Sequence, residues 1–316
     1  EKSVIPLVAK APDIVKKIIK AHRIANQWSD LLAGRTTHPV TLIPGGMTKI
    51  PTEKELKDLQ KTLKESIPDL LAVCEAVLSV ADRLPSFERP TEYISLRQDN
   101  PPTYTFYHGG ITSNDCIDQP PVPVQQWESV ANEYVTPQST AKWCRWHRDS
   151  YAVGALARFN NNGHLLSPLG QKVTQMFGLK KGCCNPFMNS IAQLAEVAHV
   201  VETAIELIDK LLTKGLREEK GKVSPKAGRG SGCVEAPRGI LFHTYEFNKK
   251  GECIAANICI PTNQNHANIQ KDFEKFVPEF MHLGEEGLRQ GLEMLVRSYD
   301  PCISCSTHML NIQFVK

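Results

Sequence analysis

The chain has 316 residues, of which 41% are hydrophobic and 22% charged, a composition typical of a globular protein with a buried core. Its formal net charge of +3, from 37 basic and 34 acidic side chains, is too small for the basic surface of a nucleic-acid-binding protein. The sequence has no run of about 18 apolar residues, so we expect no membrane insertion. Residues 1–8 lack the pattern of a secretory signal, which favours a cytoplasmic location.

Ten cysteines are spread over this long chain rather than crowded into a short one. Such a distribution indicates reduced thiols and not a disulfide framework. Cys74 falls on the apolar face of an expected helix, where we interpret it as a packing residue.

Two amphipathic helices are predicted in the first quarter of the chain. Apolar residues recur every three or four positions after Pro12, and Gly34 is the expected C-cap of this first helix. Thr52 and Glu55 have the spacing of a capping box at the start of the second helix. Pro68 lies within the second apolar pattern and is expected to break or kink the helix.

The middle of the chain alternates between expected strands, turns and helices. Residues 91–111 predict a small hairpin on the outside of the helical body, and residues 127–134 predict a short helix. Asn160-Asn161-Asn162-Gly163 is interpreted as a turn. Residues 187–212 predict the longest helix, which would extend over roughly 40 Å and form part of the core.

Glu196 and His199 on that helix have the Glu-x-x-His spacing of a di-iron carboxylate motif. The bundle-type site needs such a pair on each of two helices, and the sequence supplies only one. A structural role for these side chains is therefore favoured.

A Gly-, Lys- and Ser-rich segment, residues 215–232, divides the helical part from the C-terminal part. Beyond it, the sequence predicts two strands joined by Asn248–Gly251 and then two helices, at residues 239–247, 252–260, 264–276 and 284–299. We therefore expect a mainly α (α+β) fold, with a multi-helical bundle core and peripheral β-hairpins. Residues 1–214 would form a helical body with a hairpin insert, residues 215–232 a linker, and residues 233–316 a C-terminal region with hairpin, helices and the metal motif. We expect the three parts to be integrated in one domain.

The most informative motif is Cys302-Ile-Ser-Cys305, preceded by Asp300 and followed by His308. Two thiolates at this spacing can hold one zinc, nickel or iron ion. A redox dithiol and two unconnected packing cysteines are the alternatives for an isolated CxxC.

Several longer stretches, spread over nearly the whole chain, make the pattern specific: RTTHPVTLIPGG (35–46), VGALARFNNN (153–162), VEAPRGILFH (234–243), NICIPTNQN (257–265) and DPCISCSTH (300–308). With these segments the chain resembles the large subunit of nickel-iron hydrogenases, most of all the soluble, cytoplasmic methyl-viologen-reducing and deazaflavin-reducing type. The N-terminal RxCGxC motif of that family, which supplies two more cysteines, is absent from these residues.

The resemblance implies a nickel-iron centre whose iron carries cyanide and carbon monoxide. Cys302 would be a terminal thiolate on nickel, and Cys305 would bridge nickel and iron. The pocket for the diatomic ligands would be formed by Pro237, Pro261 and Thr262.

The resemblance also places the guanidinium of Arg238 over the open metal position, with Asp300 beside it. A preoriented charge of this kind would stabilise the charge separation of heterolytic dihydrogen cleavage, and Cys302 could receive the proton. The alternative is an Arg-Asp pair that only fastens the hairpin to the C-terminal segment.

Near the C-terminus, the resemblance implies a magnesium-type cation, or an iron, bound by His308 and by the backbone carbonyl of Ile258. Residues 309–316 follow His308, and we expect them to be a propeptide that is removed on maturation. The alternative is a permanent edge strand, because Leu310, Ile312 and Phe314 alternate with other residues.

The leading hypothesis is a hydrogenase large subunit, or the C-terminal part of one. It would need an iron-sulfur small subunit, further electron-transfer subunits, and a chain or segment that supplies the missing cysteine motif; without these we expect it to be inactive. One rival is a non-catalytic relative similar to the quinone-binding subunit of respiratory complex I. The other is a simple zinc- or thiol-binding module.

Overall fold

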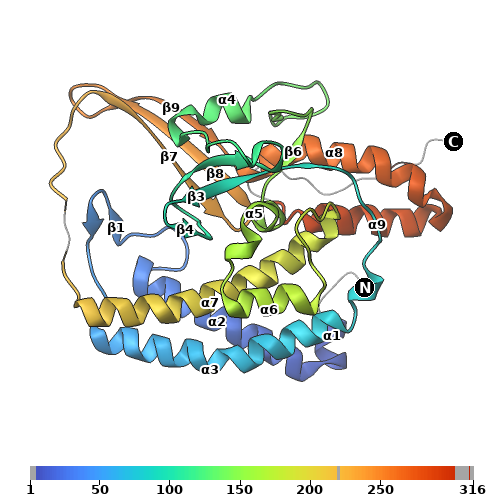
Figure 1. Cartoon of the computed structure of the whole chain (residues 1–316), viewed down its shortest axis with the longest axis horizontal. Coiled ribbons are helices and arrows are strands. Elements are labelled where there is room, and N and C mark those ends of the chain that lie inside the picture. Colours follow the sequence, from blue (N-terminus) through green and yellow to red (C-terminus); the bar gives the residue numbers. More distant parts are fainter. Residues whose placement is uncertain (1–4, 219–220, 303–312, 314–316) are drawn as a thin grey trace. The chain divides into compact units, whose positions relative to one another are not determined.

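The computed structural model describes residues 5–218, 221–302 and 313 (Figure 1). The chain forms two compact units, each assembled from segments far apart in the sequence. The first contains residues 1–83, 167–173 and 197–225, and the second contains residues 84–166, 174–196 and 226–316. The helical class with added sheets that the sequence predicts is confirmed. No helix in the described ranges is long and apolar enough to cross a membrane.

The first unit is helical. It contains α1 (Ile5–Lys10), α2 (Pro12–Ala33), α3 (Glu53–Leu78), a small hairpin of β1 (Leu42–Ile43) and β2 (Gly46–Met47), and parts of α6 (Pro168–Met176) and α7 (Asn189–Lys214). The predicted caps are confirmed: Gly34 ends α2 with a φ of 80°, and Thr52 and Glu55 form a capping box at the start of α3.

Pro68 does not break α3, which continues through it for 26 residues, as long as α7. A proline inside a helix removes one backbone hydrogen bond and costs about 3 kcal/mol. The apolar stripe of α3 continues on both sides of Pro68 and packs against α2 and α7, and this burial outweighs the lost bond. The buried residues of this core are Ile24, Leu56, Leu59, Leu63, Ala204 and Ile208.

The second unit contains a sheet in which β3 (Glu92–Asp99) is the central strand. It pairs antiparallel with β4 (Pro102–Thr103) and β5 (Gly110–Ser113), and parallel with β6 (Tyr151–Ala152). The expectation that this hairpin lies outside the helical body is wrong for β3, because Ile94 and Leu96 are fully buried. The sequence does not reveal this burial, because the polar residues Glu92 and Ser95 interrupt the apolar pattern of β3 and yet are fully buried themselves.

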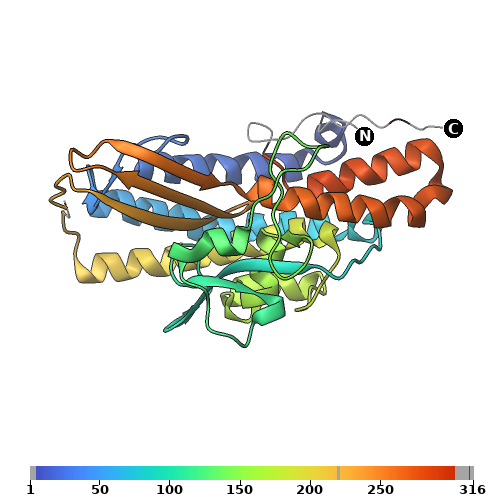
Figure 2. The ribbon, with the colours of Figure 1, turned by 90° about the horizontal axis from the view of Figure 1, so that it is seen from above.

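A second sheet has the order β7-β8-β9, all antiparallel (Figure 2). The strands are β7 (Gly228–Ala236), β8 (Gly239–Phe247) and β9 (Cys253–Cys259), so the predicted pair joined by Asn248–Gly251 is confirmed. Residues 228–232, which the sequence pattern assigns to the linker, pair instead with β8. The predicted short helix is α4 (Trp127–Ala131), and Trp127 stacks on Phe242 of β8 with the ring centres 5.1 Å apart.

The asparagines at 160–162 do not form a turn, since they end a buried helix, α5 (Ala155–Asn162). Asn161 donates to the carbonyl of Tyr93, and Asn162 donates to the carbonyl of Leu96. These bonds to β3 replace the local bonds that favour asparagine in turns. The side chains thus fix α5 on the central strand.

Helices α8 (Pro261–Phe280) and α9 (Gly284–Ser298) complete the second unit and confirm the two helices predicted there. Short 3₁₀ helices occur at Ala81–Arg83, Asn114–Cys116, Val124–Gln126, Gly163–Leu165, Pro186–Met188 and Met281–Leu283. Cys305, His308 and the tail predicted to be a propeptide lie outside the described residues, apart from residue 313.

Candidate metal centre

Pro237 and Arg238 form the two-residue tip of the hairpin between β7 and β8, since Ala236 pairs with Gly239. Gly239 has a φ of 134°, and a Cβ there would lie 2.3 Å from Cγ2 of Val153. Only glycine accepts both this backbone conformation and this close approach. The hairpin tip is therefore packed directly on the segment that leads into α5.

The same tip is held by Arg158 of α5, a side chain with 1% exposure. Its Nη1 donates to the carbonyl of Ala236 at 2.9 Å, and its Nη2 donates to the carbonyl of Pro237 at 3.2 Å. It also forms a two-bond ion pair with Glu196 at 2.5 and 2.7 Å and a bond to Glu235 at 2.9 Å. The positively charged guanidinium thus fixes the backbone where β7 enters the turn.

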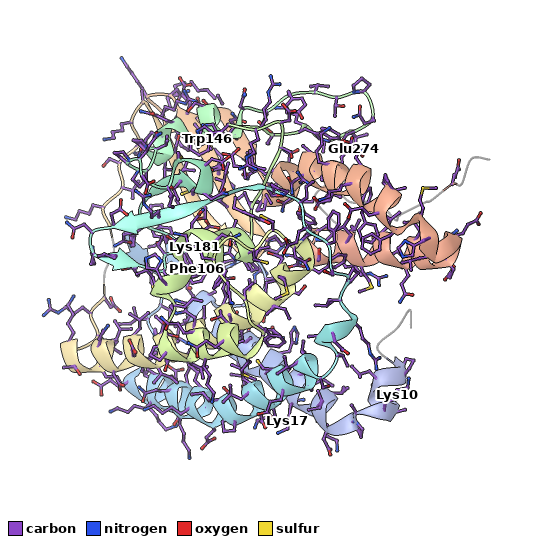
Figure 3. The ribbon with its side chains drawn as sticks, turned by 45° about the vertical axis from the view of Figure 1, so that its right-hand side comes forward. Lys10, Lys17, Phe106, Trp146, Lys181 and Glu274 are labelled. Carbon is purple, nitrogen blue, oxygen red and sulfur yellow. The ribbon has the colours of Figure 1, made fainter. Side chains whose placement is uncertain are left out.

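Further hydrogen bonds complete this buried cluster. The hydroxyl of Tyr104 donates to Glu196 at 2.6 Å, and the backbone N–H of Leu96 donates to Glu235 at 2.7 Å. Phe106, labelled in Figure 3, places its ring 5.7 Å from the Arg158 guanidinium carbon. The structural role favoured for Glu196 agrees with its pairing to Arg158.

Burial governs the charges of this cluster. It would lower the pKa of Arg158, but the carboxylates of Glu196 and Glu235 raise that pKa well above its ordinary value. Burial raises the pKa of Glu235, although Arg158 and the Leu96 N–H act in the opposite direction. Two carboxylates facing one guanidinium leave an excess of negative charge, which desolvation penalises.

Arg238 contacts the C-terminal segment through Asp300. Its Nε donates to the backbone carbonyl of Asp300 at 2.7 Å, and its Nη2 lies 3.4 Å from Oδ1 of the same residue. Asp300 has a φ of 49° and accepts a bond from Gln193 at 3.0 Å. The side chain of Asn189, at the start of α7, donates to the carbonyl of Ser298 at 2.8 Å. The turn before Cys302 is therefore held by α7 as well as by the hairpin.

Cys302 is in turn attached to the first turn of α8. Its backbone N–H donates to Oγ1 of Thr262 at 3.1 Å, and Thr262 is only 3% exposed. This bond uses a lone pair of the hydroxyl and not its proton. Pro261 precedes it as the buried first residue of α8.

The structure thus brings together four of the residues that the sequence singles out: Arg238, Asp300, Cys302 and Thr262. Pro237 lies at the same hairpin tip, and its carbonyl faces Arg158. Ile258 is paired with His243 in the sheet, and the residue is 45% exposed. Cys305 and His308 lie outside the described residues.

Arg158 and Glu235 were missed by the sequence reasoning as members of the site. A signal was present, because Arg158 is a lone charge within the otherwise apolar stretch VGALARF, and Glu235 directly precedes the Ala-Pro-Arg turn. A single charge in an apolar run indicates a buried ion pair when an opposite charge flanks a nearby turn. The pairing itself depends on the tertiary fold.

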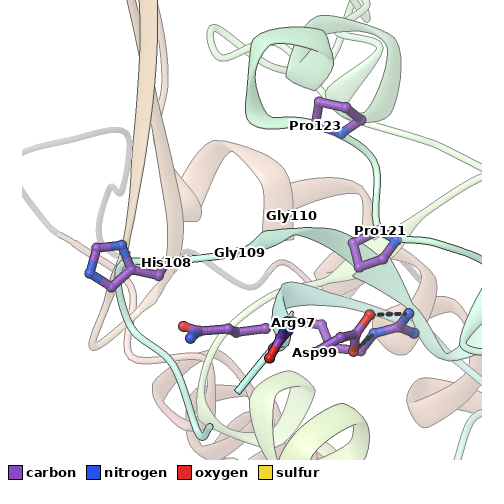
Figure 4. Close-up of a pocket in the computed structure, with 9 residues that line it drawn as sticks. Arg97, Asp99, His108, Gly109, Gly110, Pro121 and Pro123 are labelled. Carbon is purple, nitrogen blue, oxygen red and sulfur yellow. Dashed lines mark hydrogen bonds and ion pairs between the residues drawn. The ribbon is translucent and has the colours of Figure 1, made fainter. Parts of the chain in front are cut away.

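A separate hollow in the second unit lies beside β3 (Figure 4). Arg97, Asp99, His108, Gly109 and Pro121 are among its lining residues, and none of the residues predicted as a site contributes to it. Arg97 donates to Asp99 at 3.0 Å and to the carbonyl of Gln119 at 2.8 Å, so its guanidinium stabilises the surrounding loop. We assign no ligand to this hollow.

The fold is that of nickel-iron hydrogenase chains. The structure superposes on an NAD⁺-reducing [NiFe]-hydrogenase in the H₂-reduced state with a TM-score of 0.83 and 24% identity, over 97% of this chain and 71% of the other. It also superposes on the reduced Ni-Fe-Se hydrogenase from D. vulgaris Hildenborough with a TM-score of 0.62 and 20% identity, over 94% of this chain and 70% of the other.

The sequence comparisons identify the family directly. A family model described as nickel-dependent hydrogenase matches residues 99–308, more than half of the chain, so the chain belongs to that family. It is 28% identical to the alpha subunit of sulfhydrogenase 1 of Pyrococcus furiosus over 93% of this chain and 67% of that protein. It is 27% identical to a vhc subunit of the F420-non-reducing hydrogenase of Methanococcus voltae over 94% of this chain and 67% of that protein. The resemblance seen in the sequence is confirmed.

The donor atoms of the described residues are compatible with a nickel-iron centre at this place. Cys302 offers a soft sulfur ligand whose backbone is anchored by Thr262. Arg238, 41% exposed at its side chain, brings a permanent positive charge next to the same segment. These residues would form one part of such a site.

Proposed function

We propose that this chain is the catalytic large subunit, or the C-terminal part of the large subunit, of a nickel-iron hydrogenase that cleaves dihydrogen reversibly and heterolytically. Its electrons would pass to an iron-sulfur partner and from there to further electron-transfer subunits. The observation that supports this most is the meeting of three segments, the hairpin tip, the Asp300–Cys302 turn and the start of α8, at one place.

Cys302 and Cys305 would hold the nickel-iron centre, and two further thiolates would come from a chain or segment outside these 316 residues. Pro237, Pro261 and Thr262 would line the place of the cyanide and carbon monoxide on iron. The proton of the Thr262 hydroxyl, which the bond from Cys302 leaves unused, could donate to a cyanide nitrogen. When bound, the bimetallic centre supplies the open coordination position at which dihydrogen is polarised.

Arg238 supplies a fixed positive field at this position. Its Nε is tied to the Asp300 carbonyl, so the planar group is oriented before substrate arrives. Asp300 is itself fixed by Gln193, which prevents the pair from swinging away. Sγ of Cys302 is the atom that we expect to take up the proton of the cleaved dihydrogen.

We also propose a magnesium-type cation, or an iron, bound by His308 and by the backbone carbonyl of Ile258. Ile258 lies on β9, which stands at the edge of its sheet, and an edge strand directs part of its backbone carbonyls away from the sheet. A cytoplasmic location is proposed from the scattered cysteines, which are typical of reduced thiols.

The test is the fully assembled enzyme, which includes the iron-sulfur partner and the segment carrying the other two cysteines. We expect bound nickel and iron and dihydrogen-dependent viologen reduction, and we expect Cys302→Ser to lose both nickel and activity. Cys253→Ser, at an exposed thiol of β9, is the control and should keep both.

Assembled enzyme that has neither metal nor turnover would show a non-catalytic relative similar to the quinone-binding subunit of complex I. Zinc in place of nickel and iron would show a simple metal-binding module. Normal nickel content in Cys302→Ser would show that the Cys302 thiolate is not a nickel ligand.

A further inference from the structure

Two buried cysteines outside the site described above lie together in the second unit. Sγ of Cys144 and Sγ of Cys259 are 3.9 Å apart, and both residues have 0% exposure. A carboxylate oxygen of Glu133 completes a group in which the three potential ligand atoms all lie within 4.8 Å of one another.

Local structure places these residues side by side. An isolated antiparallel bridge pairs Tyr134 with Trp143, so Glu133 and Cys144 stand opposite each other at the adjacent position of the two segments. Cys259 is the last residue of β9, and Asn263 follows four residues later in the first turn of α8. The group therefore joins the loop after α4 to the junction of β9 and α8 (Figure 1).

The separation of the sulfurs matches two ligands of one ion. Two thiolates at the usual zinc-sulfur distance of about 2.3 Å and at a tetrahedral angle lie about 3.8 Å apart. A disulfide would require the two sulfurs to approach to about 2.05 Å. The observed 3.9 Å thus needs almost no adjustment for a shared cation and a large one for a covalent bond.

Asn263 adds a second feature of metal sites. Its Nδ2 faces all three ligands, at 3.0 Å from Oε1 of Glu133, 3.6 Å from the sulfur of Cys144 and 3.8 Å from that of Cys259. Amide donors directed at coordinating sulfur and oxygen orient the ligands and disperse their negative charge. The other oxygen of Glu133 lies 3.5 Å from Nζ of Lys142, whose side chain is exposed. This oxygen therefore lies on the solvent side of the group.

We propose that Cys144, Cys259 and Glu133 bind one zinc-type divalent cation, with a water molecule as the fourth ligand. The ion fastens the loop after α4 to the start of α8. That helix begins two residues beyond Cys259 and carries Thr262, the residue bonded to Cys302. The bound cation thus supports the segment beside the candidate nickel-iron site, and its presence does not depend on hydrogenase activity.

The experiment uses the full chain with Cys302→Ser and Cys305→Ser as background, which removes the competing CxxC. Zinc is titrated against a chromophoric chelator under reducing conditions, and cobalt(II) is used as a spectroscopic substitute. We expect one zinc per chain, a thiolate-to-cobalt absorption band and a higher unfolding temperature with zinc. Cys253→Ser on the same strand is the matched control and should change none of these.

Cys259→Val, which preserves the apolar volume, should weaken zinc binding by more than about 100-fold and abolish the cobalt band. Asn263→Leu should weaken zinc binding by about 10-fold or more while the cobalt band is kept. Glu133→Gln, at the rim of the group, should weaken zinc binding without loss of the folded state.

Three results would overturn the proposal. The first is no zinc in the folded background chain, and the second is equal zinc affinity in the background and in Cys259→Val. The third is a protein that contains no zinc as purified and loses both thiols on mild oxidation, with a mass that shows a Cys144–Cys259 disulfide.

Discussion

Arg158 and Arg238 carry the same charge, but their surroundings give them different tasks. Arg158 is 1% exposed and directs its donors at two carboxylates and at the carbonyls of the hairpin tip. Arg238 sits on that tip, is 41% exposed at its side chain and is tied mainly through Nε to a backbone carbonyl. The buried arginine positions the exposed one, which is the arginine that we propose acts in the reaction.

Arg238→Lys should leave the metals in place and lower dihydrogen turnover by at least about two orders of magnitude. Lysine keeps the charge but lacks the planar group whose Nε binds Asp300, so the orientation is lost. Turnover and nickel content of the assembled enzyme are the measurements. Arg229→Lys, in an exposed ion pair of β7, serves as control, and near-normal turnover in Arg238→Lys would make Arg238 a purely structural residue.

Arg158→Met should destabilise the protein by about 3–5 kcal/mol. The variant leaves Glu196 and Glu235 buried without their cation and removes the donors to Ala236 and Pro237. Chemical denaturation measures the loss. Arg229→Met breaks only an exposed pair and should cost no more than about 1 kcal/mol. A similarly small cost for Arg158→Met would show that Arg158 is not needed to compensate these two carboxylates.

At the scale of elements, α2 and α3 are joined by an apolar stripe and by a charged contact at its edge. Lys17 and Lys20 of α2 both donate to Asp69 of α3, the second at 2.7 Å. These bonds lower the pKa of Asp69 from its ordinary 3.8 to about 2. The contact is exposed to solvent, so it adds specificity to the pairing of the two helices more than stability.

Asp69→Asn should make the unfolding temperature depend less on pH between pH 5 and 2. Because the folded pKa lies below the ordinary value, folded Asp69 binds fewer protons, and its contribution is present above about pH 4 and lost as the pH falls toward 2. The unfolding temperature measured from pH 5 to 2 at low salt tests this, and added salt should shrink the difference. Asp13→Asn, whose partner Lys16 lies on the same helix, is the control. Parallel curves for Asp69→Asn and the parent would contradict the assignment.

At the scale of the whole molecule, the chain covers 67% of the length of two of its relatives and 71% of one superposed structure. Its 316 residues contain a single CxxC, whereas the metal centre that we propose needs four thiolates. The described residues supply the charged and hydroxyl groups around Cys302. The complete set of four thiolate ligands would therefore be present only in the assembled enzyme.

The chain purified by itself should contain no stoichiometric nickel and iron, because two thiolates cannot satisfy both metals. Elemental analysis and infrared spectra of the isolated chain and of the assembled enzyme are the measurements. Stoichiometric nickel and iron with cyanide and carbon monoxide bands in the isolated chain would contradict this prediction. Zinc in the isolated chain would not, since it is expected at Cys144 and Cys259.

Much of the helical structure could be predicted because it depends on local signals. The apolar period of α7, the capping box of α3 and the glycine that ends α2 each lie within a few residues, and all three are confirmed. Residues 228–232 and 160–162 were misassigned because their structure depends on distant partners in β8 and β3.

By itself, the sequence determined the helical class, the family and the residue types available for chemistry, since these depend on periodicity and on short motifs. The resemblance already implied that Asp300 lies beside Arg238, and the tertiary structure shows the contact. Only the tertiary structure decided that Thr262 holds Cys302 and that Arg158 supports the hairpin tip. It likewise decided that Cys144 lies beside Cys259, 115 residues away. Burial is the physical reason, because a charge or thiol acquires its partner and its protonation state only when folding removes water from both.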